Sequence, residues 1–203
     1  MNSKKYSRIT ICLITTLAFS PATAFAQASN SFSGRAVALQ ASAVGLALAL
    51  SDTGALPASG GNLSTSLANV NVLGLVSANA LSSATSGSGN NSQSQSSVAN
   101  LDLLGGLITA DVVTSNSSAT CSGGQAAVAG SSELVGLVVA GQQVAVVNPN
   151  VALSLPGGIS VIVNEQTSSP SGNTGTMTVN ALHVTGPAID IIVASAQSGI
   201  TCV

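Results

Sequence analysis

VANLDLLGGLITADVVTSNSSAT, residues 98–120, is the stretch that decides the fold class. Its apolar residues fall in two runs, 101–104 and 107–113, with Gly105 and Gly106 between them. Branched aliphatic residues on either side of a glycine turn are typical of a β-hairpin. This stretch therefore predicts two antiparallel strands joined by a tight connection.

Two other stretches look like copies of this unit. LANVNVLGLVSANALSSAT (67–85) repeats the strand, glycine, strand order, and VNALHVTGPAIDIIVASAQSGITC (179–202) is a weaker copy. The spacing between the copies is irregular, which disfavours a solenoid. Repeated hairpin-like units inside one all-β fold, an antiparallel sandwich or barrel, fit the pattern better.

The other apolar segments also predict strands. Segments 37–41 and 46–50 alternate large and small residues, although their alanine content leaves a helix as an alternative. Turn residues between apolar runs predict two more hairpins, 134–139 with 144–147 and 151–155 with 159–163. Short strands separated by Gly, Pro and Asn are typical of a β-sandwich or barrel.

Two polar segments are predicted to be loops. The sequence SGSGNNSQSQSS (86–97) has no residue that would build a core, and segment 168–176 contains Pro170 and Gly172. We therefore expect residues 27–203 to form a single β-rich domain with a polar low-complexity loop at 86–97.

The first 26 residues have the pattern of a cleavable signal peptide. Basic residues at 4, 5 and 8 precede an apolar run at 9–19, and Ala24-Phe25-Ala26 has the A-x-A form of a cleavage site. The apolar run is too short to span a bilayer as a permanent helix. We expect cleavage after Ala26, no stable membrane span after cleavage, and a secreted protein in the extracellular or periplasmic space.

Cleavage would leave a chain with very little positive charge. Six carboxylates stand against one basic residue, Arg35, in residues 27–203, which gives a net charge of −5. Nucleic acids and anionic membranes are bound through clustered Lys and Arg, so this composition excludes both classes of partner. Polarity comes instead from Ser, Thr, Asn, Gln and Gly, a mix that tolerates self-association.

Two cysteines, Cys121 and Cys202, lie beyond the signal segment. Exported proteins reach oxidising compartments, so we expect a Cys121–Cys202 disulfide. With one histidine, these residues are too few for a four-ligand zinc site. The sequence also has no D-x-[DN]-x-[DN]-G calcium loop. We expect no metal and no cofactor.

Few residues are candidates for catalysis. His183, the only histidine, lies near Asp190, but there is no G-x-S-x-G motif to position a serine nucleophile. Asp111, Glu165 and Asp190 are candidate acid–base groups, and hydrogen bonding at turns and strand ends is their simpler role. Beyond the signal segment the only aromatic residue is Phe32, whereas sugar sites usually stack sugars on aromatic rings. We expect no enzyme, with a hydrolase as a distant alternative.

Several segments share a pattern with one bacterial family. They are GGLITADVVTSNSSA (105–119), ELVGLVVAGQQV (133–144), the run 149–166, VNALHV (179–184) and DIIVASAQSG (190–199). Together they resemble the choice-of-anchor P family of surface or secreted proteins, best over residues 100–203. The resemblance implies surface display and no particular activity. No hydrophobic tail follows Cys202, so secretion, periplasmic residence and noncovalent retention all stay open, and LPASG (56–60) is interpreted as a turn.

These observations favour a non-enzymatic structural or interaction protein that is secreted or surface-associated. Sheet edges without lysine are poorly protected against strand addition, so we expect self-association or pairing with another surface protein, with segment 36–50 as a candidate for pairing. The alternative is a monomeric adhesin or ligand-binding module that uses the polar loops 86–97 and 168–176.

Overall fold

The computed structural model describes residues 29–203, except 44, 73, 146 and 147. The expected signal peptide, residues 1–26, lies outside the described residues. Thirteen strands make up the described fold. Within it, no helix has the length and apolar character needed to cross a membrane.

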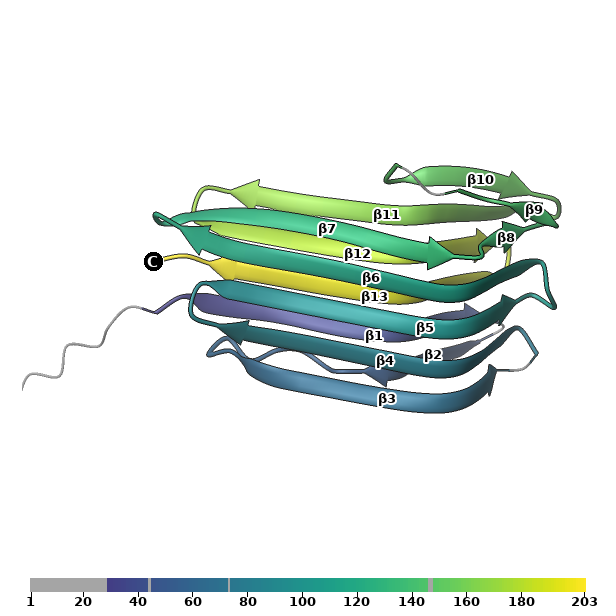
Figure 1. Cartoon of the computed structure of the whole chain (residues 1–203), viewed down its shortest axis with the longest axis horizontal. Coiled ribbons are helices and arrows are strands. Elements are labelled where there is room, and N and C mark those ends of the chain that lie inside the picture. Colours follow the sequence, from purple (N-terminus) through teal and green to yellow (C-terminus); the bar gives the residue numbers. More distant parts are fainter. Residues whose placement is uncertain (1–28, 44, 73, 146–147) are drawn as a thin grey trace, which may run out of the picture.

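Two antiparallel sheets pack face to face, which confirms the predicted all-β sandwich (Figure 1). Sheet A has the strand order β10-β11-β12-β13-β1-β2, and sheet B has the order β3-β4-β5-β6-β8-β9, with β7 also paired to β6. The strands of sheet A are β1 (Ser31–Ala43), β2 (Leu46–Asp52), β10 (Val151–Leu155), β11 (Ile159–Ser171), β12 (Thr174–Gly186) and β13 (Ile189–Thr201). Those of sheet B are β3 (Gly61–Val72), β4 (Val76–Ser88), β5 (Asn91–Leu103), β6 (Ile108–Ser122), β7 (Gln125–Val135), β8 (Val138–Val139) and β9 (Gln142–Gln143).

The three repeated sequence units each form a hairpin. Segment 67–85 covers the end of β3 and most of β4, segment 98–120 joins β5 to β6, and segment 179–202 joins β12 to β13. In two of these turns, a side-chain oxygen accepts a hydrogen bond from the backbone amide of a glycine. Asn71 Oδ1 accepts a hydrogen bond from Gly74 N at 3.2 Å, and Asp102 Oδ1 accepts one from Gly106 N at 2.7 Å.

One transverse row of residues interrupts the regular alternation of sheet B. The registers of the flanking pairs align Asn69, Asn79, Asn100, Asp111 and Gly136 across the sheet. Asn69, Asn100 and Gly136 have φ values of 53°, 52° and 65°. Asn and Gly adopt this left-handed conformation more readily than other residues do. We call this row the crease of sheet B.

Sheet A has a matching crease. Ser51, Ala38, Ala194, Ala181 and Asn164 align across it, and Ser51, Ala194 and Asn164 again have positive φ, between 50° and 54°. All five are buried, whereas the asparagines and the aspartate in the crease of sheet B are exposed. The crease of sheet A therefore points into the core and that of sheet B points to solvent. A local break of this kind bends a strand, so the two sheets bend together.

Strand alternation inverts at the crease. In β5, the buried positions are 92, 94, 96 and 98 before the crease and 101 and 103 after it. In β6 they are 108 and 110 on one side, then 113, 115, 117 and 119 on the other. One face of each strand therefore points to the core along its whole length. The residues on that face have even numbers on one side of the crease and odd numbers on the other.

The core has three zones along the strands. An apolar zone reaches from the crease to the hairpin turns and includes Leu39, Leu103, Ile108, Leu182 and Ile191, all essentially buried. A hydroxyl zone follows, made of eight buried residues: Ser83, Thr85, Ser92, Ser94, Ser96, Ser115, Ser117 and Ser198. A small apolar cluster of Phe32, Leu56, Ala119, Ile200 and Cys202 closes the far end.

Hydrogen bonds join the two sheets across the hydroxyl zone. Ser92 Oγ donates to Ser33 O at 2.8 Å, and Ser94 Oγ donates to Gln197 O. The hydroxyls of Ser117 and Ser198 lie 2.8 Å apart. Buried hydroxyls are tolerated when they are paired in this way, and of the eight only Ser115 Oγ has no hydrogen-bond partner among the described residues. Small residues and paired hydroxyls therefore replace aliphatic packing in this half of the sandwich.

The expected loop at 86–97 is wrong. β4 continues to Ser88 and β5 begins at Asn91, so only Gly89 and Asn90 form the turn. The serines at 92, 94 and 96 face the hydroxyl zone and the glutamines between them face outward. Hydrogen bonds across the core stabilise a strand whose side chains are too polar for ordinary hydrophobic packing.

Other expectations need smaller corrections. Segment 168–176 is also strand, apart from a turn at Gly172 and Asn173. Only part of the segment 36–50 lies at a sheet edge: β1 is paired on both sides by β13 and β2, whereas β2 is the last strand of sheet A. The hairpin expected at 134–147 is present but short, formed by β8 and β9, and residues 146 and 147 lie outside the described residues.

The predicted cysteine pair is confirmed. Cys121 at the end of β6 and Cys202 after β13 lie at disulfide distance, with 5.7 Å between their Cα atoms. The pair links the two sheets at the end where both described chain ends lie, and Val203 N donates to Asn30 Oδ1 there at 3.2 Å. A cross-link that closes so long a loop stabilises a fold by about 4 kcal/mol.

Candidate functional site

The outer face of sheet B carries a regular grid of neutral polar side chains. Side chains alternate across a strand, so the segment whose serines fill the hydroxyl zone turns its other residues to solvent. The strand registers align Asn62, Ser86, Gln93 and Ser118 in one row across β3 to β6. The next row contains Ser64, Ala84, Gln95, Asn116 and Ser131. We call these two rows the amide–hydroxyl face.

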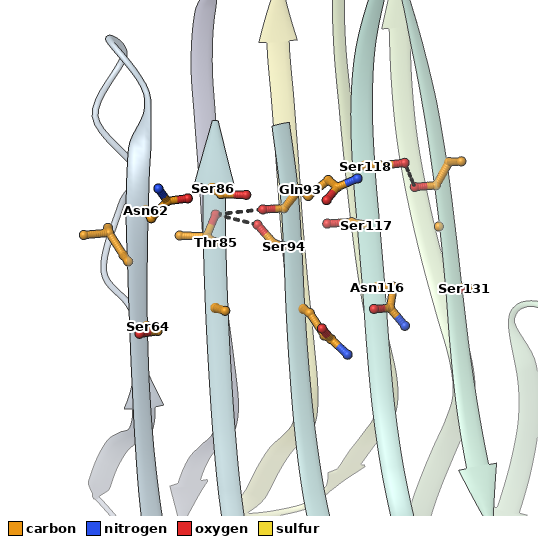
Figure 2. A pocket seen from close by; sticks show the side chains of 15 residues that line it. Asn62, Ser64, Thr85, Ser86, Gln93, Ser94, Asn116, Ser117, Ser118 and Ser131 are labelled. Atoms are coloured by element: carbon orange, nitrogen blue, oxygen red, sulfur yellow. Dashed lines mark hydrogen bonds between the residues drawn. The ribbon is translucent and has the colours of Figure 1, made fainter. Parts of the chain in front are cut away.

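The amide–hydroxyl face is hollowed. A depression of about 700 Å³ lies over five neighbouring strands, β3 to β7, and none of its fifteen lining residues is charged (Figure 2). Asn62 and Ser64 come from β3, Ser86 from β4, Gln93 from β5, Asn116 and Ser118 from β6, and Ser131 from β7. The hollow is therefore a property of the whole sheet and not of one loop.

Most polar groups of this face are free to bind a partner. Within the described part of the chain, the amides of Gln93, Gln95 and Asn116 make no side-chain hydrogen bond to the protein. Ser118 Oγ makes a long one, 3.5 Å, to Ala129 O. An amide offers both a donor and an acceptor, so the grid can hydrogen-bond a ligand of either polarity.

The two long margins of sheet B are the second candidate surface. In the described residues, β3 pairs only with β4, and β7 pairs only with β6. β3 has no charged residue and no proline, while β7 carries Glu133. Each margin also exposes one large aliphatic side chain, Leu67 at 42% and Val135 at 44%. β3 is the outermost strand of the sandwich on its side (Figure 1).

The structure brings together three of the residues considered for catalysis. On the outer face of sheet A, His183 Nδ1 lies 3.0 Å from Glu165 Oε2, and His183 Nε2 lies 3.2 Å from Asp190 Oδ1. Asn180 Nδ2 also donates to Glu165 Oε2, at 2.6 Å. Each ring nitrogen thus has a carboxylate partner, and neither faces a serine hydroxyl as a catalytic base would. This arrangement links β11, β12 and β13 through side-chain hydrogen bonds.

Asp111 lies apart from this cluster, on the opposite sheet. It occupies the crease of sheet B, where its carboxylate packs against Gly136 and leaves no room for a Cβ atom there. In the described ranges, no three His, Cys, Asp or Glu side chains gather as metal ligands. The carboxylates are therefore distributed among separate structural roles.

Arg35 on β1 and Asp52 on β2 form an ion pair. Arg35 Nε donates to Asp52 Oδ1 at 2.9 Å, and its terminal nitrogen donates to Oδ2 at 2.6 Å. These hydrogen bonds lower the pKa of Asp52, against the effect of partial burial, and the Gly54 amide adds to the lowering. Because Arg35 is occupied here, it is not available to an anionic ligand.

Comparison of the chain with models of protein families, with curated proteins and with solved structures finds no match. The resemblance to the choice-of-anchor P family therefore stays a prediction. Function must be argued from the surfaces themselves.

The sequence reading missed the amide–hydroxyl face. The signal was present in the alternation Ser92-Gln93-Ser94-Gln95-Ser96, which has the period of two of a strand. The segment 86–97 is polar, of low complexity and without a core-forming residue, and such a composition predicts a loop. The outward residues form a continuous surface only when the strand registers place β3 to β7 side by side.

Proposed function

We propose that this chain is an exported, non-enzymatic structural protein that self-associates through the free margin of β3. The observation that carries the proposal is a long uncharged edge strand with an exposed leucine close to its midpoint. β3 runs from Gly61 to Val72, and Leu67 lies at its centre. Proteins that stay monomeric usually protect such an edge with lysine, proline or an inward-facing charge.

A two-fold axis beside Leu67 gives the simplest assembly. Two copies of β3 related by such an axis run antiparallel, which is the better hydrogen-bonded arrangement. The two Leu67 side chains would then lie opposite each other on one face and bury each other's apolar surface. The pairing would be isologous and closed, the commonest form of protein dimer.

The other margin of sheet B is less suited to this contact. Glu133 lies on β7, and a charged side chain on an edge strand disfavours pairing with a second edge. Figure 1 also places β10 and β11 of sheet A beyond β7 on that side, whereas no described strand lies beyond β3, and β2 reaches β3 through Ser51 Oγ, which donates to Thr65 O at 3.0 Å. The proposed assembly is therefore a dimer through β3 and not an open fibre.

Light scattering over a concentration series tests this proposal. The oxidised protein should move from the mass of one chain to the mass of two as its concentration rises. Leu67→Lys should hold it at the mass of one chain, because a lysine at the edge cannot be buried against its own copy. Val135→Lys is the matched control, since Val135 is equally exposed on the other margin. A monomer at every concentration, or a dimer unaffected by Leu67→Lys, would reject the proposal.

Export rests on two features of the chain. The N-terminal segment has the basic, apolar and A-x-A order of a signal peptide, and the Cys121–Cys202 pair suits an oxidising compartment. We propose a secreted or periplasmic location. Fractionation of cells that express the full chain should recover a protein that begins at Gln27 outside the cytoplasm.

A further inference from the structure

We propose that the amide–hydroxyl face binds neutral polysaccharide chains laid across the strands of sheet B. This inference rests on the hollow and its chemistry, and does not depend on the proposed dimer. It assigns a ligand class to a surface whose residues have no other evident role.

Charge excludes the other common polymers from this face. Nucleic acids and acidic polysaccharides need basic side chains, and the hollow contains none. Arg35, the sole basic residue of the described chain, lies on sheet A and is bound to Asp52. Basic polymers would need carboxylates, which are likewise missing from the lining. A charged partner would lose its hydration in the hollow without gaining an opposite charge. A neutral partner avoids that cost.

The polar side chains of the hollow can both donate and accept hydrogen bonds, as the hydroxyl groups of a sugar do. Each sugar hydroxyl both donates and accepts hydrogen bonds, as do the side chains of Gln93, Gln95 and Asn116. Equivalent positions on neighbouring strands repeat at about 4.8 Å, which is close to the length of one pyranose unit in an extended chain. A chain laid across β3 to β7 therefore meets a new set of donors and acceptors at nearly every sugar.

A hydrogen-bonding face of this kind differs from an ordinary sugar groove. Phe32, the single aromatic residue of the described chain, is buried in the end cluster and cannot stack on a sugar. Each sugar is consequently held only by hydrogen bonds that exchange with water, and these contribute little individually. Affinity must come from many sugars bound at once, so the ligand is a polymer and not a free monosaccharide.

The hollow also argues against a second copy as its occupant. Two identical concave faces cannot close on each other without leaving space between them, and such space forfeits packing. A narrow convex chain fills the hollow along its length. The shape of the face thus favours the same ligand as its chemistry.

Retention on a panel of polysaccharides tests the inference. The neutral probes are cellulose, chitin, cross-linked dextran and starch, and the charged probes are alginate and chitosan. We expect retention on at least one neutral polymer, weak dependence on salt, and no retention on alginate or chitosan. Retention on none of the neutral polymers, or stronger binding to a charged polymer than to any neutral one, would overturn the proposal.

A matched pair of variants locates the site. Gln93→Ala with Gln95→Ala should weaken binding about tenfold or more, since two amide groups are lost from the centre of the hollow. Gln40→Ala with Gln197→Ala removes two glutamines from sheet A and should leave binding unchanged. Equal binding by both double variants would overturn the assignment to this face. A fall in solution mass caused by the first double variant would instead assign the face to a second copy of the chain.

Discussion

Asn69 in β3 and Asn100 in β5 lie in the same transverse row of sheet B, and both have positive φ, 53° and 52°. Each follows an alanine in a repeated unit, as Ala68-Asn69 and Ala99-Asn100. The repeated sequence therefore encodes the crease as well as the hairpins. Because sheet A has its own crease at the same level, the bend belongs to the whole sandwich.

Replacing Asn100 tests whether the crease stores backbone strain. Asn100→Ala should lower the free energy of unfolding by about 1 kcal/mol, because alanine tolerates the left-handed conformation less well than asparagine. Asn100→Gly should cost less, since glycine adopts this conformation without steric penalty. Thermal or chemical unfolding measures both. Asn116→Ala, an exposed change on β6 outside the positive-φ set, is the control and should stay within about 0.5 kcal/mol of wild type.

The hydroxyl zone should resist even a single added methyl group. A Cβ atom at Gly34 would collide with the Thr85 hydroxyl and press on that of Ser94. Gly34→Ala should therefore destabilise the protein by about 1–3 kcal/mol, the usual cost of overpacking. Thr85→Ala removes the colliding oxygen, so Gly34→Ala with Thr85→Ala should cost less than the sum of the two single changes. If the costs of Gly34→Ala and Thr85→Ala simply add, the collision with Thr85 is not the cause of the destabilisation. The sheets would then move apart to make room for the added methyl group.

Sequence patterns predicted the fold well where apolar residues mark the strands. The hairpins at 98–120 and 151–163 and the Cys121–Cys202 pair follow from alternation, turn residues and export. The first half of β5, residues 91–97, was missed because its buried side chains are serines. Their partners, such as the carbonyls of Ser33 and Gln197, are far away in the chain. No local pattern reveals that such a bond will form.

The candidate surfaces were harder to predict for the same reason. Poor edge protection was visible in the lack of lysine, and the predicted segment 36–50 does include an edge strand, β2 of sheet A, but nothing in the sequence indicated that β3 is the edge of sheet B. Which strand is outermost depends on the order of strands in a sheet, and that order is set by contacts between distant segments. The outward glutamines likewise become a surface only after five strands are placed in register.

The ion pair between Arg35 and Asp52 predicts a small pH dependence. The pKa of Asp52 is lowered in the folded protein, so its contribution to stability is present above about pH 4 and is lost as the pH falls through the folded pKa. Because 46% of the Arg35 side chain is exposed, the contribution at neutral pH should not exceed about 1 kcal/mol. Asp52→Asn should lower the melting temperature at pH 7 and converge with wild type as the pH falls below the lowered pKa of Asp52. Arg35→Gln should have the same effect at pH 7, and combining the two changes should add little.

The proposed dimer and the proposed ligand make a joint prediction about chain length. Asn62 and Ser64 belong both to the hollow and to β3, so pairing of two β3 strands would place two amide–hydroxyl faces side by side. A long polysaccharide could then engage both faces, while a short oligosaccharide occupies one. Leu67→Lys should therefore weaken binding of the retained polymer about tenfold or more, through loss of effective concentration, and leave binding of its hexasaccharide unchanged. Affinity electrophoresis for the polymer and calorimetry for the hexasaccharide measure the two arms. Equal weakening of both would mean that Leu67→Lys damages the face itself, and unchanged binding of both would mean that each face acts alone.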